Sequence, residues 1–66
     1  MDIIKKEYTS GDAVRLELDV SKGDKLPKVG DIFPLDKLEY QITYIELKYI
    51  DRNDVLVLVV EAERLV

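Results

Sequence analysis

The most restrictive feature of this sequence is an unbroken apolar run, Val55–Val60, within the stretch DVLVLVVEAE. A strand with one dry face alternates apolar and polar residues, so a continuous run predicts a strand that is covered on both faces. The run is far too short to span a bilayer, which requires about 20 apolar residues. Alternation returns after Val60, where Glu61 and Glu63 point to one face and Ala62 to the other.

The two faces of this last strand therefore differ in what should cover them. The even positions are expected to face the core: Leu56, Leu58, Val60 and Ala62. The odd positions form a short apolar patch on the face that later becomes acidic: Val55, Val57 and Val59. Exposed valines in a patch are unfavourable unless something covers them. Either another chain covers them at an interface, or other parts of the same chain do.

The chain has 66 residues, which is enough for one small domain, residues 1–66. Such a domain buries only about 60% of the surface that its unfolded chain exposes, so it often relies on a disulfide, a metal or a partner chain. The sequence has no Cys and no His, which excludes disulfides, thiolate zinc sites and the commonest metal ligand. We therefore expect no metal and no cofactor, and we expect a homo-oligomer or a complex with another protein.

Turn residues at short intervals divide the chain into strands. The clearest strand is Ala13–Val20, in which apolar residues alternate with charged ones. Pro34 is expected to end the third strand, because proline donates no ladder hydrogen bond. The expected strands are 3–8, 13–20, 31–33, 39–50 and 55–64, joined by turns at 9–12, 21–30, 35–38 and 51–54.

Residues 39–50 allow two interpretations. Four apolar residues have the spacing of a helical stripe and predict a helix near 36–49: Leu38, Ile42, Ile45 and Tyr49. The same stretch is rich in Tyr, Ile and Thr, which favour strands. As a strand, it changes its apolar phase near Tyr44–Ile45, and a β-bulge there would explain the change. We favour the strand.

Five short strands joined mostly by hairpins predict an all-β fold, either a small five-stranded antiparallel barrel (SH3-like) or a curled sheet. The stretch PKVGDIFPL, residues 27–35, has a Gly-Asp turn that leads into a short apolar strand. It resembles stretches that are common in small SH3-like barrels. The resemblance is confined to these residues and implies no functional residue. The alternative fold is α+β with one helix near 36–49.

The sequence offers no catalytic motif. Glu61 and Glu63 share a strand face, but the solvated end of a strand explains them equally well. The turn DRND, residues 51–54, lacks the glycine and the ligand spacing of a calcium-binding loop. We therefore predict a non-enzymatic, cytoplasmic protein-interaction or assembly module that self-associates and does not contact membranes. The predicted interface residues are Val55, Val57, Val59, Tyr40 and Tyr49.

A second hypothesis is a small barrel that binds single-stranded nucleic acid. Three lysines lie in the 21–30 loop, and Tyr44 could stack on bases from the same strand face as Tyr40. The lysines are Lys22, Lys25 and Lys28. The chain carries 10 basic and 14 acidic residues, and its net charge of -4 disfavours contact with phosphate backbones. Nucleic acid is therefore the less favoured partner.

Overall fold

The computed structural model describes residues 2–20, 25–50 and 55–65, apart from the side chains of residues 49, 50 and 55. These residues form five strands and no helix, so the prediction of a helix near 36–49 is wrong and that of an all-β fold is confirmed. The strands are β1 (Asp2–Tyr8), β2 (Ala13–Val20), β3 (Ile32–Leu35), β4 (Leu38–Ile50) and β5 (Val55–Arg64). They form one antiparallel sheet in the order β1-β2-β5-β4-β3.

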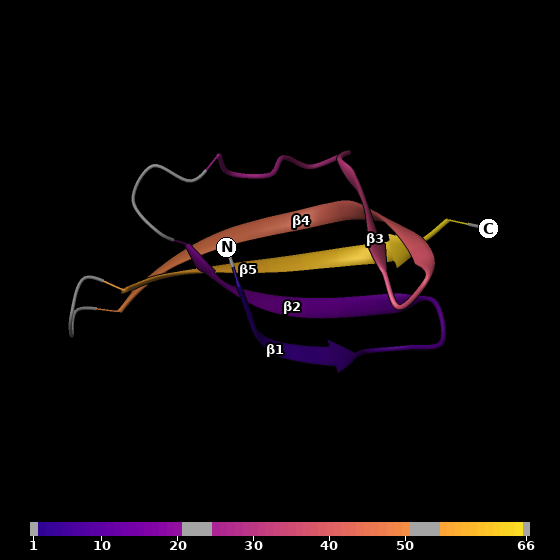
Figure 1. Ribbon diagram of the computed structural model, residues 1–66, viewed down its shortest axis with the longest axis horizontal. Coiled ribbons are helices and arrows are strands. Elements are labelled where there is room, and N and C mark those ends of the chain that lie inside the picture. The colour runs from indigo at the N-terminus through magenta and orange to yellow at the C-terminus, as the bar shows by residue number, and fades with distance from the viewer. Residues whose placement is uncertain (1, 21–24, 51–54, 66) are drawn as a thin grey trace.

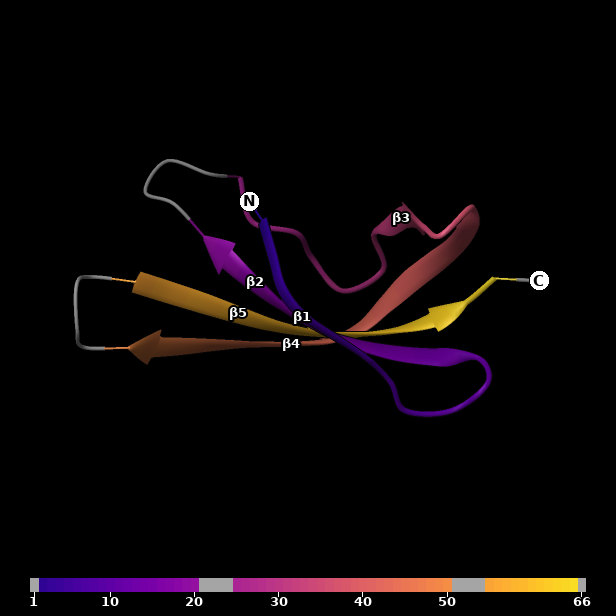
Figure 2. The ribbon, with the colours of Figure 1, turned by 60° about the horizontal axis from the view of Figure 1, so that its bottom comes forward.

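The sheet is strongly curled, and the result is a half-barrel (Figure 1). Figure 2 shows that β3 and the segment 25–31 lie on one side of the other strands. We call this side the concave face and the opposite side the convex face. The edge strands β1 and β3 do not pair with each other in the described sheet, so the barrel stays open between them. Of the two predicted forms, the curled sheet describes the fold.

A bulge in β4 explains the phase change that was noted in the sequence. The register with β5 shifts between Ile42 and Tyr44, slightly before the predicted position. Because the bulge adds one residue, Ile42 and Ile45 both pack with the core although they are three residues apart. The hydroxyl of Thr43, the extra residue, donates to the Glu61 carbonyl at 3.2 Å. A second register shift lies in β1, between Ile3 and Lys5.

The core lies on the concave face. It comprises residues of the three inner strands: Val14, Leu16, Val20, Leu58, Val60, Ala62, Tyr40 and Ile42. The ring of Phe33 stacks on that of Tyr40 with their centroids 6.0 Å apart, which brings β3 over this core. The alternation that predicted the inward positions of β2 and β5 is thus confirmed for Leu58, Val60 and Ala62.

Two of the odd positions of β5, Val57 and Val59, are also buried, on the convex face. Val57 is 3% exposed and Val59 is 0% exposed, although no second layer of backbone lies over this side in Figure 2. In the sheet register, Val57 lies between Asp19 and Lys48, and Val59 lies between Glu17 and Glu46. These four residues flank the valines on both sides, and the low exposure of the valines in the single chain means that side chains of the same sheet cover them. Of the two alternatives, cover from within the chain is therefore present.

The third strand runs through Pro34 instead of ending before it. This is possible because β3 is an edge strand, where a missing N–H can face solvent. The predicted turn after it is confirmed: Asp36 and Lys37 join β3 to β4, with φ angles of 51° and 69°. Aspartate tolerates this left-handed conformation better than most residues, whereas lysine does not.

Candidate interaction cleft on the concave face

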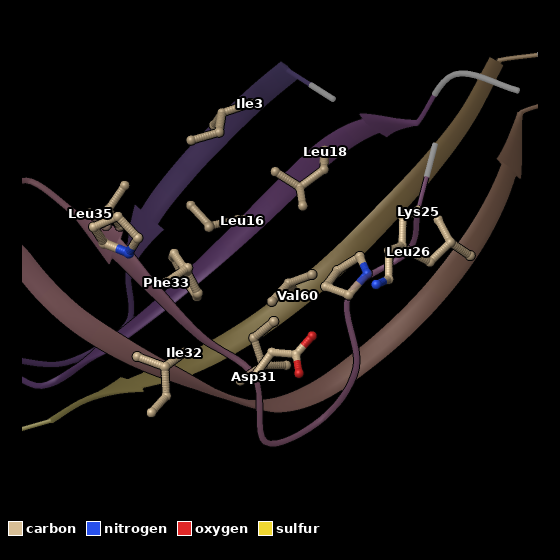
Figure 3. Close-up of a pocket in the computed structure, with 13 residues that line it drawn as sticks. Ile3, Leu16, Leu18, Lys25, Leu26, Asp31, Ile32, Phe33, Leu35 and Val60 are labelled. Carbon is tan, nitrogen blue, oxygen red and sulfur yellow. The ribbon is translucent and has the colours of Figure 1, made fainter. Parts of the chain in front are cut away.

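A cleft of about 410 Å³ opens on the concave face, in the gap that the half-barrel leaves (Figure 3). One wall comes from β1 and β2, with Ile3, Leu16 and Leu18. The opposite wall comes from the segment 25–35, which includes Leu26, Pro27, Phe33 and Leu35. Val60 and Ile42 contribute from β5 and β4. The lining is therefore almost wholly apolar, and its members are far apart in the sequence.

Two large apolar residues line the cleft and are also exposed to solvent. Ile3, on β1, is 51% exposed, and Leu26, in the segment before β3, is 44% exposed. Ile32 also borders the cleft, but its side chain lies on the face of β3 opposite to Phe33, and Figure 3 shows it pointing away. We call Ile3 and Leu26 the apolar rim. An apolar rim around an apolar cleft is typical of a surface that receives another molecule.

A tight turn holds the 25–35 wall in place. The Asp31 N–H donates to the Lys28 carbonyl at 3.0 Å, and the Asp31 carboxylate accepts from the Lys28 N–H at 2.9 Å. Gly30 takes a φ of 97°, which a side chain would disfavour. Backbone hydrogen bonds then tie the turn to β4, from Gly30 N to the Ile42 carbonyl and from Ile42 N to the Asp31 carbonyl. This is the Gly-Asp turn that the sequence predicted.

Two charged residues, Lys25 and Asp31, lie at the margin of the cleft. The Asp31 carboxylate accepts the hydrogen bond that stabilises the turn, so its role is structural. Within the described residues no polar or charged side chain is buried, and no three acidic residues come together as potential metal ligands. The arrangement can bind apolar groups by burial. It holds no pair of groups positioned for proton transfer or nucleophilic attack.

A polar cluster connects the two edges of the sheet across the concave face. Asp36, in the β3–β4 turn, accepts hydrogen bonds from Lys6 Nζ at 2.8 Å and from the Tyr8 hydroxyl, both on β1. We call these three residues the Asp36 clasp. The Lys6 ammonium also lies 5.6 Å from the centroid of the Tyr8 ring, within the range of a cation–π contact.

The clasp shifts the pKa of each of its members. Hydrogen bonds from Lys6 and then Tyr8 lower the pKa of Asp36. The hydrogen bond to Asp36 raises the pKa of Lys6 and also that of Tyr8. All three groups are exposed to water, so the clasp aligns two edges of the sheet without acting as a buried ion pair.

Three of the five predicted interface residues do not lie at the surface of the single chain. Val57 and Val59 are buried on the convex face, and Tyr40 is 2% exposed within the core. Val55 and Tyr49 lie in β5 and β4, but their side chains are outside the described part of the structure. The buried residues have no surface of their own to offer a partner.

The predicted nucleic-acid residues are not brought together either. Lys25 lines the concave cleft, and Lys28 is exposed in the turn beside it. Tyr44 is 45% exposed but lies opposite Glu61, on the convex face. Its hydroxyl donates to Glu46 at 3.3 Å, and the nearby Glu46 charge raises the pKa of Tyr44. Lys22 and the turn at 51–54 lie outside the described residues.

The cleft was not foreseen from the sequence. A chain of 66 residues has little interior to enclose a pocket, but the open curl of the sheet provides a cleft of hundreds of Å³. The rim residues are large and apolar and lie in short segments, which is a sequence pattern that could have indicated an exposed apolar surface. They are far apart along the chain, and only the curl of the sheet brings them together.

Comparison of the chain with protein-family models, with curated proteins and with solved structures finds no match. Among the described residues, no helix is long and apolar enough to cross a membrane. The function of this protein is therefore inferred from the cleft and its surroundings.

Proposed function

We propose that the chain is a non-enzymatic protein-interaction or assembly module. The observation that carries the proposal is the apolar cleft of about 410 Å³ with its exposed rim of Ile3 and Leu26. A small domain gains little by leaving large apolar side chains around one opening, unless a partner covers them. The residues that line the cleft are almost wholly apolar. Such a lining suits an apolar segment of a protein and does not suit a polar substrate.

The occupant that we propose for the cleft is an apolar segment of another protein. The cleft is open on the concave face, so side chains on one side of a peptide can enter it. Lys25 at the margin favours a segment with a neighbouring acidic residue, because opposite charges facing across an interface set its orientation. Nucleic acid is the weaker candidate, since Lys25 and Tyr44 lie on different faces of the sheet.

Selection from a library of random peptides displayed on phage tests this function. We expect the selected peptides to be apolar and to bind the purified chain in a fluorescence anisotropy titration. Ile3→Asp should weaken this binding by about tenfold or more, since burying a large aliphatic side chain contributes about 1.5–3 kcal/mol.

Leu47 provides a matched control for this experiment. Ile3 is 51% exposed and Leu47 is 54% exposed, but of the two only Ile3 lines the cleft. Leu47→Asp should therefore bind the selected peptides as the unmodified chain does. If no peptide is enriched, or if both variants bind equally well, the cleft is not the interaction surface.

The same proposal includes self-association. Sixty-six residues without a disulfide bury a modest core, and a second copy of the chain is a common source of additional buried surface. The buried valines of β5 do not supply the contact, so it must be sought on an exposed element.

A further inference from the structure

The strand β1 is the most exposed element of the sheet. All seven of its residues are exposed, including Ile4 at 55% and Tyr8 at 49%. It pairs with β2 on one side only, and its other side is the free edge at the bottom of Figure 1. An unpaired strand edge presents backbone donors and acceptors that another strand can satisfy.

The other edge of the sheet is less suited to pairing. The strand β3 has four residues, and one of them is Pro34, which has no N–H to donate. The strand β1 is longer and contains no proline. If two chains join through a sheet edge, β1 is therefore the edge that can form the longer ladder.

We propose that β1 pairs antiparallel with β1 of a second copy of the chain, about a two-fold axis through Lys6. This proposal rests on the self-association included in the proposed function and names its surface. The two five-stranded sheets would join into one continuous sheet, with both clefts left open. Such an interface is closed, because each chain uses the same surface.

The register follows from the faces of the strand. Beyond its bulge, Lys5 and Glu7 lie opposite Glu17 and Arg15, on the convex face. Lys6 lies opposite Leu16, on the concave face. A two-fold axis perpendicular to the sheet keeps each face on its own side, so residues that oppose each other across the new pairing must share a face.

Charge complementarity selects the axis at Lys6. With Lys6 opposite Lys6, each Lys5 faces the Glu7 of the other copy, which gives two opposite-charge pairs. With the axis at Lys5, the two copies of Lys5 face each other and Glu7 has no cation opposite. An axis at Ile4 would lie on the bulge, which disrupts the ladder.

The clasp removes the main objection to this register. Two lysines at the axis would repel each other, but each Lys6 Nζ lies 2.8 Å from its own Asp36 carboxylate. The charge at the centre of the interface is therefore balanced within each chain. Lysines on an edge usually prevent pairing. Here Glu7 of the other copy offsets the charge of Lys5, and Asp36 of the same chain offsets that of Lys6.

Charge reversal on β1 tests the pairing directly, with molar mass measured by sedimentation from micromolar to millimolar concentration at low salt. We expect the unmodified chain to form a dimer. Glu7→Lys should weaken the dimer by about tenfold or more, since it places like charges opposite each other twice, and Lys5→Glu should do the same. The double variant Lys5→Glu/Glu7→Lys should dimerise again, because the two charges have only exchanged places.

Mixing the two single variants gives a sharper result. The Lys5→Glu chain carries only acidic charges at positions 5 and 7, and the Glu7→Lys chain carries only basic ones. We expect a mixed dimer to form while each variant alone stays monomeric. As a control, Lys48→Glu changes the charge of β4, away from the proposed interface, and should leave the dimer intact.

The outcomes separate this proposal from the function of the cleft. A chain that stays monomeric at millimolar concentration overturns the β1 pairing, and so does a dimer that tolerates both single charge reversals. Apolar peptides would still bind a monomer in the cleft beside Ile3, and the cleft proposal would stand. A charge-sensitive dimer that binds no peptide would support the pairing and reject the cleft.

Discussion

The two faces of β5 are equally buried, but different parts of the molecule cover them. On the concave face, Leu58 and Val60 are each 1% exposed and belong to a core with residues of β2 and β4. On the convex face, Val57 and Val59 are as well buried, but only the side chains of the neighbouring strands flank them. Burial on both faces of a strand therefore does not require a second layer of backbone. Side chains with long stems on the flanking strands are sufficient.

The largest expected difference between the faces concerns a buried charge. Leu58→Glu places a carboxylate in the core without a partner, and this should cost more than the total stability of the domain, about 3–10 kcal/mol for its size. Val57→Glu places the carboxylate among side chains that already reach water, next to Lys48. We expect the first variant to be unfolded and the second to stay folded, as judged by circular dichroism and amide NMR dispersion.

The mass of the Val57→Glu variant adds a second test of the convex face. Because Val57 is covered within one chain, its substitution should leave the oligomeric state unchanged. A loss of dimer in a folded Val57→Glu variant would show that the convex face contacts a partner, as the sequence suggested. That result would count against pairing through β1.

Removing the same atoms from each face gives a smaller and more quantitative comparison. Val59 and Val60 are adjacent, identical and 0% and 1% exposed. Val60→Ala should cost about 2–3 kcal/mol, because it loses transfer energy and leaves a cavity in a packed core. Val59→Ala should cost about 1 kcal/mol, because flexible neighbouring stems can fill the space.

Urea unfolding followed by circular dichroism measures both costs. The dependence of the unfolding free energy on urea should be the same in both variants, which would show that the unfolded states are comparable. Equal costs for the two substitutions would mean that the convex side is packed as rigidly as the core.

The sequence predicted the parts of the fold that depend on local pattern. The bounds of β2 and β5 followed from alternation and from flanking turn residues, and they agree with the structure. The helix near 36–49 failed because a bulge at Thr43 reproduces the spacing of a helical stripe within a strand. The end of β3 was misplaced because the rule about proline applies to inner strands, and nothing local marked β3 as an edge.

The candidate site was less predictable than the fold. Ile3 and Leu26 belong to one rim only because the sheet curls until β1 and the segment before β3 face each other. Curl depends on bulges and on the twist accumulated over all strands, and no short stretch of sequence encodes it. The clasp was missed for the same reason, since Lys6 and Asp36 are 30 residues apart.

In the β3–β4 turn, on the concave side, a substitution that relieves an unfavourable backbone conformation should stabilise the domain. Lys37 has a φ of 69°, which costs a non-glycine residue about 1–2 kcal/mol. Lys37→Gly should stabilise the domain by about 0.5–1 kcal/mol, because the gain exceeds the greater freedom of glycine in the unfolded chain. Lys37→Ala keeps the strain and should give no such gain in urea unfolding. A gain from alanine as large as from glycine would exclude backbone strain as the cause.

The smallest expected effect concerns the clasp, which spans the concave face and leaves the convex face untouched. The pKa of Asp36 is lowered from its usual 3.8, so its contribution to stability is complete above that pH and is lost as the pH falls through the lowered value. The pKa values of Tyr8 and Lys6 are raised from 10.0 and 10.5, so their contributions are present below these values and are lost as the pH rises through the raised ones.

Asp36→Asn isolates this effect, because it keeps the shape of the side chain and removes its charge. The difference in urea midpoint between the two proteins should be constant near neutral pH and should shrink below pH 3.8. Hydrogen exchange should show faster opening at Leu16, which lies opposite Lys6 on the concave face, and no change at Val59 on the convex face. Faster exchange at both residues would mean that the clasp stabilises the whole sheet, and the two faces would then share one source of stability.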